Sequence, residues 1–500
     1  MLTRKPFETA TPESVGIRSA DILYYIGALE HSNTEMHGLM IMRRGKLCAQ
    51  GWWAPFAPEI RHGLQSHTKT YAATAVGIAY TEGLLRLDER IIDIFPEDAP
   101  EDPSENLKLL TVRDVLCMGC GMDEMPRNSE HWIHDFLHIP VNHKPGTTYM
   151  YNSAGSTLLG SIVRKKTGLG LHDYLTPRLF NKIGIDPDNL RWLRMADGIE
   201  VGGGGLFATT EDNFRLMKLY ADGGVWEGER ILAKDYVKLA TTNQNDSATE
   251  SKNNPEASDN FLGYGFQIWM CKPKGAYRAD GAMGQFTIVL PEQDMIIAIT
   301  ETAVGAHWAQ STLDITWDFV EKIAVHGALP ENPGAYDALQ RKLARLNIGN
   351  PPCQPYSPKV PEIGGKTFVM DSGHFTPFTG NFMTGEGPDD IVRFAFDFDV
   401  YGFVWRFETA SGRKEAVRVA TGGTRFQNIL GKPSDCTQLY LCDAYWPEEN
   451  VLEMHCRWLE TCLQDTYRLR FGKDGRVEIE ASNNSPFLFG KVEPITAHME

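Results

Sequence analysis

This sequence lacks the features that would place a protein on a membrane or on nucleic acid. No apolar run in its 500 residues approaches the length needed to span a bilayer. Residues 1–10 lack the apolar core of a secretory signal peptide, so we expect none. No cluster of Lys and Arg offsets the formal net charge of −16, which disfavours nucleic acid and anionic membrane surfaces as partners.

Cysteine is sparse and odd in number. Nine cysteines are spread along the chain, and without a secretory signal this pattern predicts reduced thiols and a cytoplasmic protein. Cys117 and Cys120 have the spacing of a redox pair, but no thioredoxin-like pattern of strand and helix surrounds them. We expect both thiols to pack inside the protein.

The overall composition is that of a folded protein with more than one domain. Hydrophobic residues make up 42% and charged residues 23%, which argues against disorder. A chain of this length exceeds one ordinary hydrophobic core, so two or more domains are expected. The sequence shows no internal repeat.

The most informative motif is Ser66-His-Thr-Lys69, which precedes an apolar helical run at residues 71–80. Serine needs a base beside it to act as a nucleophile. Three residues make nearly one helical turn, so Ser66 and Lys69 share a face, and the first turn offers unpaired N–H groups to an oxyanion. Ser-x-x-Lys is the nucleophile motif of penicillin-recognising enzymes. Taken alone, the tetrapeptide is better explained as a helix N-cap and a solvated lysine, so its surroundings decide.

Those surroundings resemble the β-lactamase-related serine hydrolases, which include class C β-lactamases, DD-peptidases and family VIII esterases. The resemblance runs in order through roughly residue 325. It implies a serine hydrolase domain, and some relatives carry a lipocalin-like C-terminal β-domain. The matching segments are residues 64–69, 82–89, 95–97, 110–121, 145–155 and 202–212.

The resemblance assigns a second catalytic motif. The family usually has Tyr-x-Asn there, and the matching residues are Tyr151, Asn152 and Ser153. Tyr151 is thereby implied as a catalytic acid or base, with a packing tyrosine as the alternative. Ser153 stands where asparagine is usual, and its shorter side chain has one donor rather than two.

The third motif of the family is Lys-Thr-Gly or His-x-Gly, and its nearest match is residues 278–286. This alignment puts Arg278 at the Lys/His position and Gly281 near the oxyanion strand, and it adds Asp280 as a substrate-binding candidate. The changes in the second and third motifs fall where relatives bind β-lactam carboxylates, so we expect poor β-lactam turnover. Trp269 and Trp308 are candidates for lining the acyl pocket, with core packing as an equal alternative.

Two further patterns have competing explanations. His131, His134 and His138 lie at helical spacing that could hold a metal ion, but a partly exposed helix beside the cleft explains them better. The glycines at 202–205 could suggest a phosphate loop, yet no P-loop lysine follows them, so a turn required by the fold is preferred. We therefore expect no metal and no organic cofactor.

The order of elements predicts an α+β fold, an antiparallel sheet flanked by helices, in residues 1–328. A helix at 19–32 and a hairpin around residues 43–45 come first, and helical segments fill roughly 66–240. Short strands at 263–270, 284–290 and 295–300 and a helix at 312–325 close the domain.

The remainder of the chain differs in character. Residues 329–361 are rich in proline around a short helix and are predicted to be a linker. Residues 362–500 alternate in the strand pattern and predict an all-β, barrel-like domain. The apolar residues expected to help form its core are Phe394, Phe396, Phe398, Val404, Trp405, Tyr467 and Leu469.

The sequence thus predicts a cytoplasmic serine hydrolase that cleaves an ester or amide bond in a small molecule or short peptide. Ser66 is the expected nucleophile, Lys69 its base and Tyr151 the acid. A D-amino-acid peptidase or amidase is the alternative among enzymes. A catalytically silent ligand-binding protein is the alternative of another class. The oligomeric state stays open.

Overall fold

The computed structural model describes residues 4–303, 309–323, 327–376, 389–430, 439–484 and 495–500. The chain forms two compact units, Met1–Ile348 and Gly349–Glu500. The limit between them falls inside the proline-rich segment 329–361, and the limits of the three predicted segments stay predictions. Across the described ranges, no helix combines the length and apolar character needed to cross a membrane.

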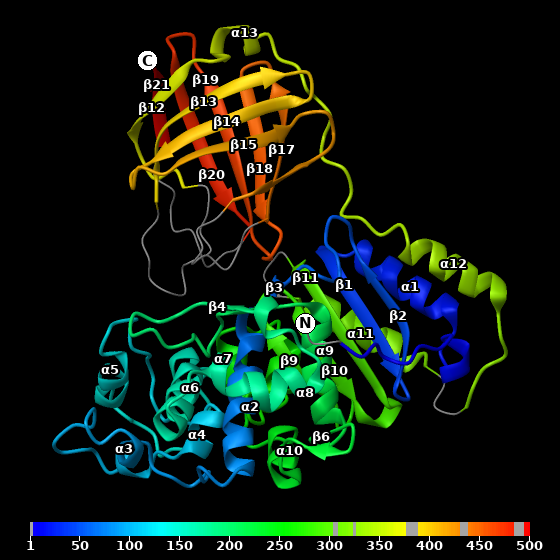
Figure 1. Cartoon of the computed structure of the whole chain (residues 1–500), viewed down its shortest axis with the longest axis vertical. Helices are drawn as coiled ribbons and strands as arrows, with labels where there is room; N and C mark the ends of the chain where they lie inside the picture. The colour runs from blue at the N-terminus through cyan, green and yellow to red at the C-terminus, as the bar shows by residue number, and fades with distance from the viewer. Residues whose placement is uncertain (1–3, 304–308, 324–326, 377–388, 431–438, 485–494) are drawn as a thin grey trace. The chain divides into compact units, whose positions relative to one another are not determined.

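The first unit is built on one antiparallel sheet, as predicted. Its six strands have the order β2-β1-β11-β10-β9-β8, so strands from both ends of the unit meet at its centre (Figure 1). Their bounds are β1 Thr34–Arg43, β2 Lys46–Trp52, β8 Trp269–Met270, β9 Tyr277–Gly281, β10 Gln285–Leu290 and β11 Met295–Ala303.

Turn residues set the strand ends. Arg44 and Gly45 have φ of 51° and 71° between β1 and β2, which confirms the predicted hairpin. The expected strand at 263–270 is shorter than predicted, because Gly263 (φ 111°) and Gln267 (φ 57°) adopt backbone conformations that break an extended run. Only β8 remains of it.

Helices cover both faces of this sheet. On one face lie α1 (Ser19–Glu30), α11 (Gln310–Glu321) and α12 (Pro333–Leu343), whose apolar residues join those of β1, β10 and β11 in one core. The Tyr25 ring stacks on Phe319 with ring centres 4.5 Å apart, and its hydroxyl meets Thr316 Oγ1 at 2.8 Å. The predicted helices at 19–32 and 312–325 are thereby confirmed to within a few residues.

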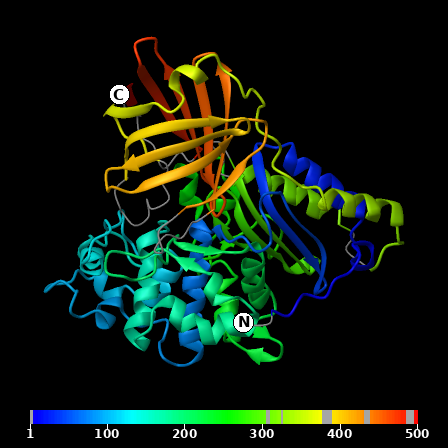
Figure 2. The ribbon, with the colours of Figure 1, turned by 45° about the horizontal axis from the view of Figure 1, so that its top comes forward.

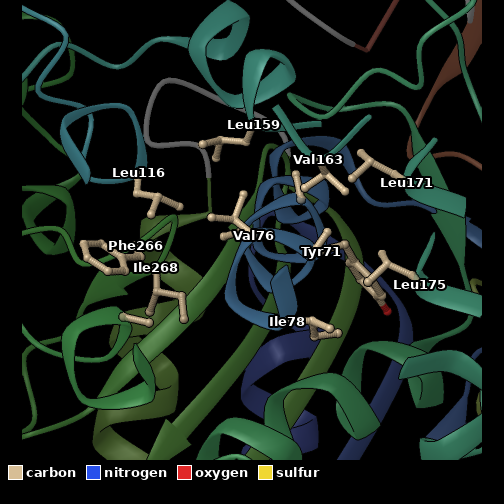
Figure 3. Packing of buried hydrophobic residues seen from close by; sticks show 14 of the residues in the cluster. Tyr71, Val76, Ile78, Leu116, Leu159, Val163, Leu171, Leu175, Phe266 and Ile268 are labelled. Atoms are coloured by element: carbon tan, nitrogen blue, oxygen red, sulfur yellow. The ribbon is translucent and has the colours of Figure 1, made fainter. Parts of the chain in front are cut away.

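The other face carries the larger helical part, with α2 (Thr68–Thr81) at its centre. Nearly every residue of α2 is buried, so small side chains and glycine let neighbours approach from all sides. Figure 3 shows apolar side chains of α4, α6 and α7 around it. The surrounding elements are α3 Ile91–Ile94, α4 Val112–Leu116, α5 Trp132–His138, α6 Ser153–Thr167, α7 Leu171–Leu175, α8 Asn181–Ile183, α9 Thr210–Ala221 and α10 Lys234–Ala240.

Short strands interrupt the helical region. β3 (His62–Gly63) and β4 (Arg191–Trp192) pair with β5 (Leu206–Ala208), which ties the segment before α2 to the segment before α9. A separate two-stranded ribbon joins β6 (Val225–Trp226) to β7 (Glu229–Arg230). The prediction that helical segments fill roughly 66–240 therefore missed β4, β5, β6 and β7.

The second unit is a closed β-barrel preceded by α13 (Val360–Ile363), which confirms the predicted all-β domain. Figure 2 shows β13, β14 and β15 crossing in front of the later strands. Phe394, Phe396, Trp405, Tyr467 and Leu469 lie in its core as expected. The strands are β12 Thr367–Ser372, β13 Ile391–Asp399, β14 Gly402–Thr409, β15 Lys414–Ala420, β16 Phe426–Ile429, β17 Leu439–Glu448, β18 Val451–Trp458, β19 Gln464–Phe471, β20 Arg476–Asn483 and β21 Ile495–Met499.

The barrel closes between β15 and β17, where one parallel pair, Ala420 with Asp443, is formed. The side chain of Asn428 on β16 completes the closure. Its Oδ1 accepts from Arg418 N at 2.8 Å, and its Nδ2 donates to Arg418 O at 3.0 Å and to Tyr440 O at 3.2 Å. A side-chain amide thus takes the place of a backbone strand partner at this position.

Candidate active site

Ser66 lies in a short 3-10 turn, Gln65–His67, directly ahead of α2. Leu64 N donates to Leu206 O at 2.9 Å, so β5 fixes the chain just before the turn. Gln65 has φ of 50°, a left-handed conformation uncommon for a residue with a side chain. This turn leaves Ser66 half-buried, with its hydroxyl at the start of a helix.

Lys69 is fully buried one turn later, and its Nζ lies 2.9 Å from Ser66 Oγ. The same Nζ donates to the carbonyl oxygen of Gly203. Burial lowers the pKa of Lys69 from 10.5 to about 7, while the Asp280 carboxylate acts in the opposite direction. The amine is therefore partly neutral near neutral pH, which a proton acceptor requires.

The glycine run explains how a carbonyl reaches Lys69. A Cβ on Gly202 would lie 2.6 Å from Ser156 O, and one on Gly203 would lie 2.5 Å from Ser153 O. Only glycine lets this segment pack so closely on α6. The sequence predicted a structural turn here, and its use in orienting Lys69 could not be read from the glycines alone.

Tyr151 also meets the nucleophile. Lys69 Nζ lies 4.7 Å from the centre of its ring, and its phenol is close enough to Ser66 for that side chain to affect it. Burial raises the pKa of Tyr151 far above its usual value, against the smaller opposing effect of the Ser66 side chain. The phenol therefore stays protonated and can donate a proton or a hydrogen bond.

An aromatic cluster holds Tyr151 in place. Its ring stacks on Trp269 with centres 5.7 Å apart and planes at 21°. Tyr264 meets Trp269 edge-on at 4.7 Å, and Tyr149 packs beside both. Trp269 is thus buried and packs against Tyr151, while Trp308 lies outside the described residues. No periodic pattern in the sequence indicates that Tyr149 and Tyr264 belong to this cluster.

Ser153 is the first residue of α6. Its N–H donates to Met125 Sδ at 3.2 Å, and within the described chain its hydroxyl has no hydrogen-bond partner. The neighbouring Asn152 caps the helix, with Oδ1 accepting from Gly155 N at 2.7 Å. Asn152 Nδ2 is buried and has no hydrogen-bond partner among the described residues, so this amide has an unused donor one residue after Tyr151.

The third predicted motif lies on β9, beside the nucleophile turn. A Cβ on Gly281 would be 2.1 Å from Leu64 O and 3.2 Å from His67 N, so the strand end passes directly against the turn. Glycine is required for this approach. Gly281 and Ser66 therefore bring two stretches of backbone together where an oxyanion would form.

Arg278 and Asp280 precede Gly281 on the same strand, β9. The Arg278 side chain is fully buried, and its Nε donates to Asp280 Oδ2 at 2.8 Å. Its other donors reach Met270 O at 3.0 Å and Asn260 Oδ1 at 2.6 Å. Asp280 keeps part of its carboxylate exposed and interacts electrostatically with Lys69.

These features are those of a known family. The sequence model described as Beta-lactamase matches residues 31–312, which is more than half of the 500-residue chain. The chain belongs to the Beta-lactamase family. Members of this family are serine hydrolases, among them amide and ester hydrolases and DD-peptidases.

Several known members of the Beta-lactamase family resemble this chain. The 6-aminohexanoate-dimer hydrolase of Paenarthrobacter ureafaciens is 25% identical over 253 residues, covering 46% of this chain and 64% of that protein. An Escherichia coli K12 protein provisionally named as a D-alanyl-D-alanine carboxypeptidase is 26% identical over 246 residues, covering 38% of this chain and 57% of that protein. The chain therefore spans less than two thirds of these relatives.

A solved structure supports the fold. A Bacillus anthracis protein provisionally named as a 6-aminohexanoate-dimer hydrolase superposes with a TM-score of 0.51 at 17% identity. The match covers 65% of this chain and 89% of that one. At this identity the likeness establishes the Beta-lactamase fold and nothing about the substrate.

The histidine pattern and the cysteine pair, which could have suggested a metal or redox site, are separate from this site. The His134 and His138 rings stack with centres 3.8 Å apart, and among the described residues no three His, Cys, Asp or Glu side chains come together to hold a metal ion. Cys117 and Cys120 are buried free thiols, and burial raises the pKa of Cys117 to about 12. A thiol held protonated in this way is a poor redox nucleophile.

Proposed function

We propose that this member of the Beta-lactamase family hydrolyses an ester or amide bond through an acyl-enzyme on Ser66. The observation that carries the proposal is the 2.9 Å contact between Lys69 Nζ and Ser66 Oγ, with Lys69 fully buried. A buried lysine loses charge, and a neutral amine is the base that a serine nucleophile needs.

The first step uses the two partners of Lys69. Neutral Lys69 donates one N–H to Gly203 O, which leaves its lone pair directed at the Ser66 hydroxyl. Ser66 Oγ then attacks the carbonyl carbon as its proton passes to Lys69. We assign oxyanion stabilisation to backbone N–H groups of the nucleophile turn and of the β9 end at Gly281.

Breakdown of the tetrahedral intermediate needs an acid. We assign this role to Tyr151, a protonated phenol beside Ser66 and Lys69, which would give a proton to the leaving group and regain it by way of Lys69. Water then attacks the acyl-enzyme with the same groups acting in reverse. None of these steps calls for a metal or an organic cofactor.

The alternatives differ in what the site turns over. A D-amino-acid peptidase or amidase would use the same residues on a peptide bond. A silent ligand-binding protein would keep the cleft without acylation. The names of the two relatives, a dimer hydrolase and a carboxypeptidase, favour hydrolysis over silent binding.

Covalent labelling separates these cases. A fluorophosphonate should add its mass to the intact protein, and the adduct should be absent from Ser66→Ala. An adduct that persists in Ser66→Ala would overturn the assignment of the nucleophile. A folded wild-type protein that neither reacts nor turns over activated esters would favour the binding protein.

We place the reaction in the cytosol, on the strength of the cysteine count.

A further inference from the structure

The end of β9 presents an acidic group, rather than a basic one, beside the nucleophile. Asp280 precedes Gly281, whose backbone lies against the turn that holds Ser66. Asp280 is close enough to act electrostatically on both Lys69 and Tyr151. A substrate bound over Ser66 would therefore meet the field of this carboxylate.

Arg278 does not reverse that charge for a ligand. Its guanidinium is fully buried, and its donors are engaged by Asp280, Met270 O and Asn260 Oδ1. A buried and fully committed arginine has no free fork to bind a substrate carboxylate. It acts on Asp280, whose orientation it fixes from one side.

Asp280 itself has capacity for a ligand. Arg278 contacts its Oδ2, and among the described residues its Oδ1 has no hydrogen-bond partner. Its side chain is 19% exposed, so the free oxygen can be reached. Burial raises the pKa of Asp280 while Arg278 lowers it, so the carboxylate is poorly solvated and gains from a second cation.

A second carboxylate has the same sign. Glu250 is half-buried and also acts electrostatically on Tyr151. Two cations face these groups: Arg278, which pairs with Asp280 and opposes its effect on Tyr151, and Lys69, whose charge is weakened by burial. Because the Arg278 guanidinium is fully buried and Asp280 is partly exposed, the charge that a ligand meets at the end of β9 is that of the carboxylate, which attracts cations and repels anions.

We propose that Asp280 selects substrates that carry a positively charged nitrogen close to the scissile carbonyl and rejects those with a carboxylate there. Arg278 is the positioning residue that holds Asp280. This inference rests on the proposed function, since it takes Ser66 as the nucleophile. It adds a substrate class, cationic esters or amides, to that function.

Three matched p-nitrophenyl esters test it on the full chain. One has an acyl chain ending in trimethylammonium, the second its uncharged tert-butyl isostere, and the third a carboxylate of similar length. The wild-type kcat/KM should favour the cation over its isostere about tenfold, as expected for charges several Å apart at a protein surface. The carboxylate ester should be the poorest substrate, and salt should reduce the preference.

Variants locate the preference. Asp280→Asn should bring the cation-to-isostere ratio to near one, whereas Asp88→Asn, which changes an exposed carboxylate on the surface, should leave the ratio unchanged. This ratio compares two substrates on the same protein. A change in the fraction of folded protein, or in the strength of Lys69 as a base, affects both rates alike and therefore cancels. If Asp280→Asn fails to fold, the wild-type ratio and its salt dependence still decide.

The outcomes separate the two proposals. A wild type that is labelled at Ser66 but shows no preference for the cation overturns the selectivity and leaves the hydrolase. A preference that survives in Asp280→Asn overturns the assignment to this residue. A protein with no labelling at Ser66 and no ester turnover overturns the hydrolase, and the selectivity falls with it.

Discussion

The Nζ of Lys69 lies 4.7 Å from the centre of the Tyr151 ring. Burial lowers the pKa of the lysine and raises that of the tyrosine, so both side chains are driven toward their neutral forms. A neutral amine accepts a proton and a neutral phenol donates one. Burial thus favours the two protonation states that the proposed base and the proposed acid require.

Removing the base should abolish activity and stabilise the fold. Lys69→Met should lower the rate of Ser66 acylation by about 10²–10⁴-fold. Folding lowers the pKa of Lys69 from 10.5 to about 7, so holding the charged lysine inside the protein opposes folding. This cost in free energy is complete below pH 7 and decreases as pH rises toward 10.5.

Denaturant unfolding at a pH below 7 measures this effect. Lys69→Met should raise the free energy of unfolding by about 2–4 kcal/mol. Lys218→Met, at a partly exposed lysine paired with Asp222, is the control and should change it by no more than about 0.5 kcal/mol. A destabilised but active Lys69→Met protein would contradict the role given to this lysine.

The pH dependence of kcat/KM should follow Lys69. The rate should rise as pH increases through about 7, because the lysine must lose its proton to act as the base. Lys69→Arg, which stays charged, should show no such rise. Asp280 raises the pKa of Lys69, so Asp280→Asn should move the midpoint to lower pH. A midpoint unaffected by Asp280→Asn would argue against this electrostatic link.

A hydroxyl deletion tests the proposed acid. Tyr151→Phe keeps the ring that stacks on Trp269 but removes the proton donor, so kcat should fall by about 10²-fold or more with little loss of stability. Tyr149→Phe is the matched control, because the buried Tyr149 hydroxyl has no hydrogen-bond partner in the part of the chain that the structure describes. Equal rates for both variants would remove Tyr151 from the mechanism.

The contact between β9 and the nucleophile turn should be intolerant of one methyl group. Gly281→Ala would place Cβ 2.1 Å from Leu64 O, so the turn must shift, and activity should fall by about 10²-fold as the reacting groups separate. Gly27→Ala adds the same methyl group in α1, where nothing lies within 4 Å, and should stabilise the protein by about 0.5–1 kcal/mol. Full activity in Gly281→Ala would refute the oxyanion assignment.

Hydrolysis of β-lactams should be weak. Relatives bind the β-lactam carboxylate at positions that here hold Ser153 and residues of β9, where Arg278 is committed to the protein and Asp280 repels an anion. Nitrocefin turnover should be far below that of an activated neutral ester of similar size. Comparable kcat/KM values for the two would contradict this expectation.

Local patterns predicted much of this fold. The α1 periodicity, the turn at Arg44 and Gly45 and the three-residue spacing of Ser66 and Lys69 depend on neighbours in sequence, so they could be read directly. The approach of Gly203 O to Lys69 joins residues more than a hundred positions apart, and nothing in the local pattern encodes it.

The same limit applies to the third motif. Its alignment named Arg278, Asp280 and Gly281 together, but only the structure distinguishes a buried arginine, a partly exposed carboxylate and a close backbone contact. The strand predicted at 263–270 was too long because alternation alone does not reveal left-handed residues such as Gln267.

The closed barrel has a chemical weak point at Asn428. Its amide is fixed in direction, since Arg418 N needs an acceptor while Arg418 O and Tyr440 O need donors. Deamidation would replace that donor with a negatively charged carboxylate oxygen facing the Arg418 and Tyr440 carbonyl oxygens, so two hydrogen bonds would give way to repulsion between β15 and β17. The long-term stability of the barrel closure thus depends on the Asn428 side-chain amide remaining intact.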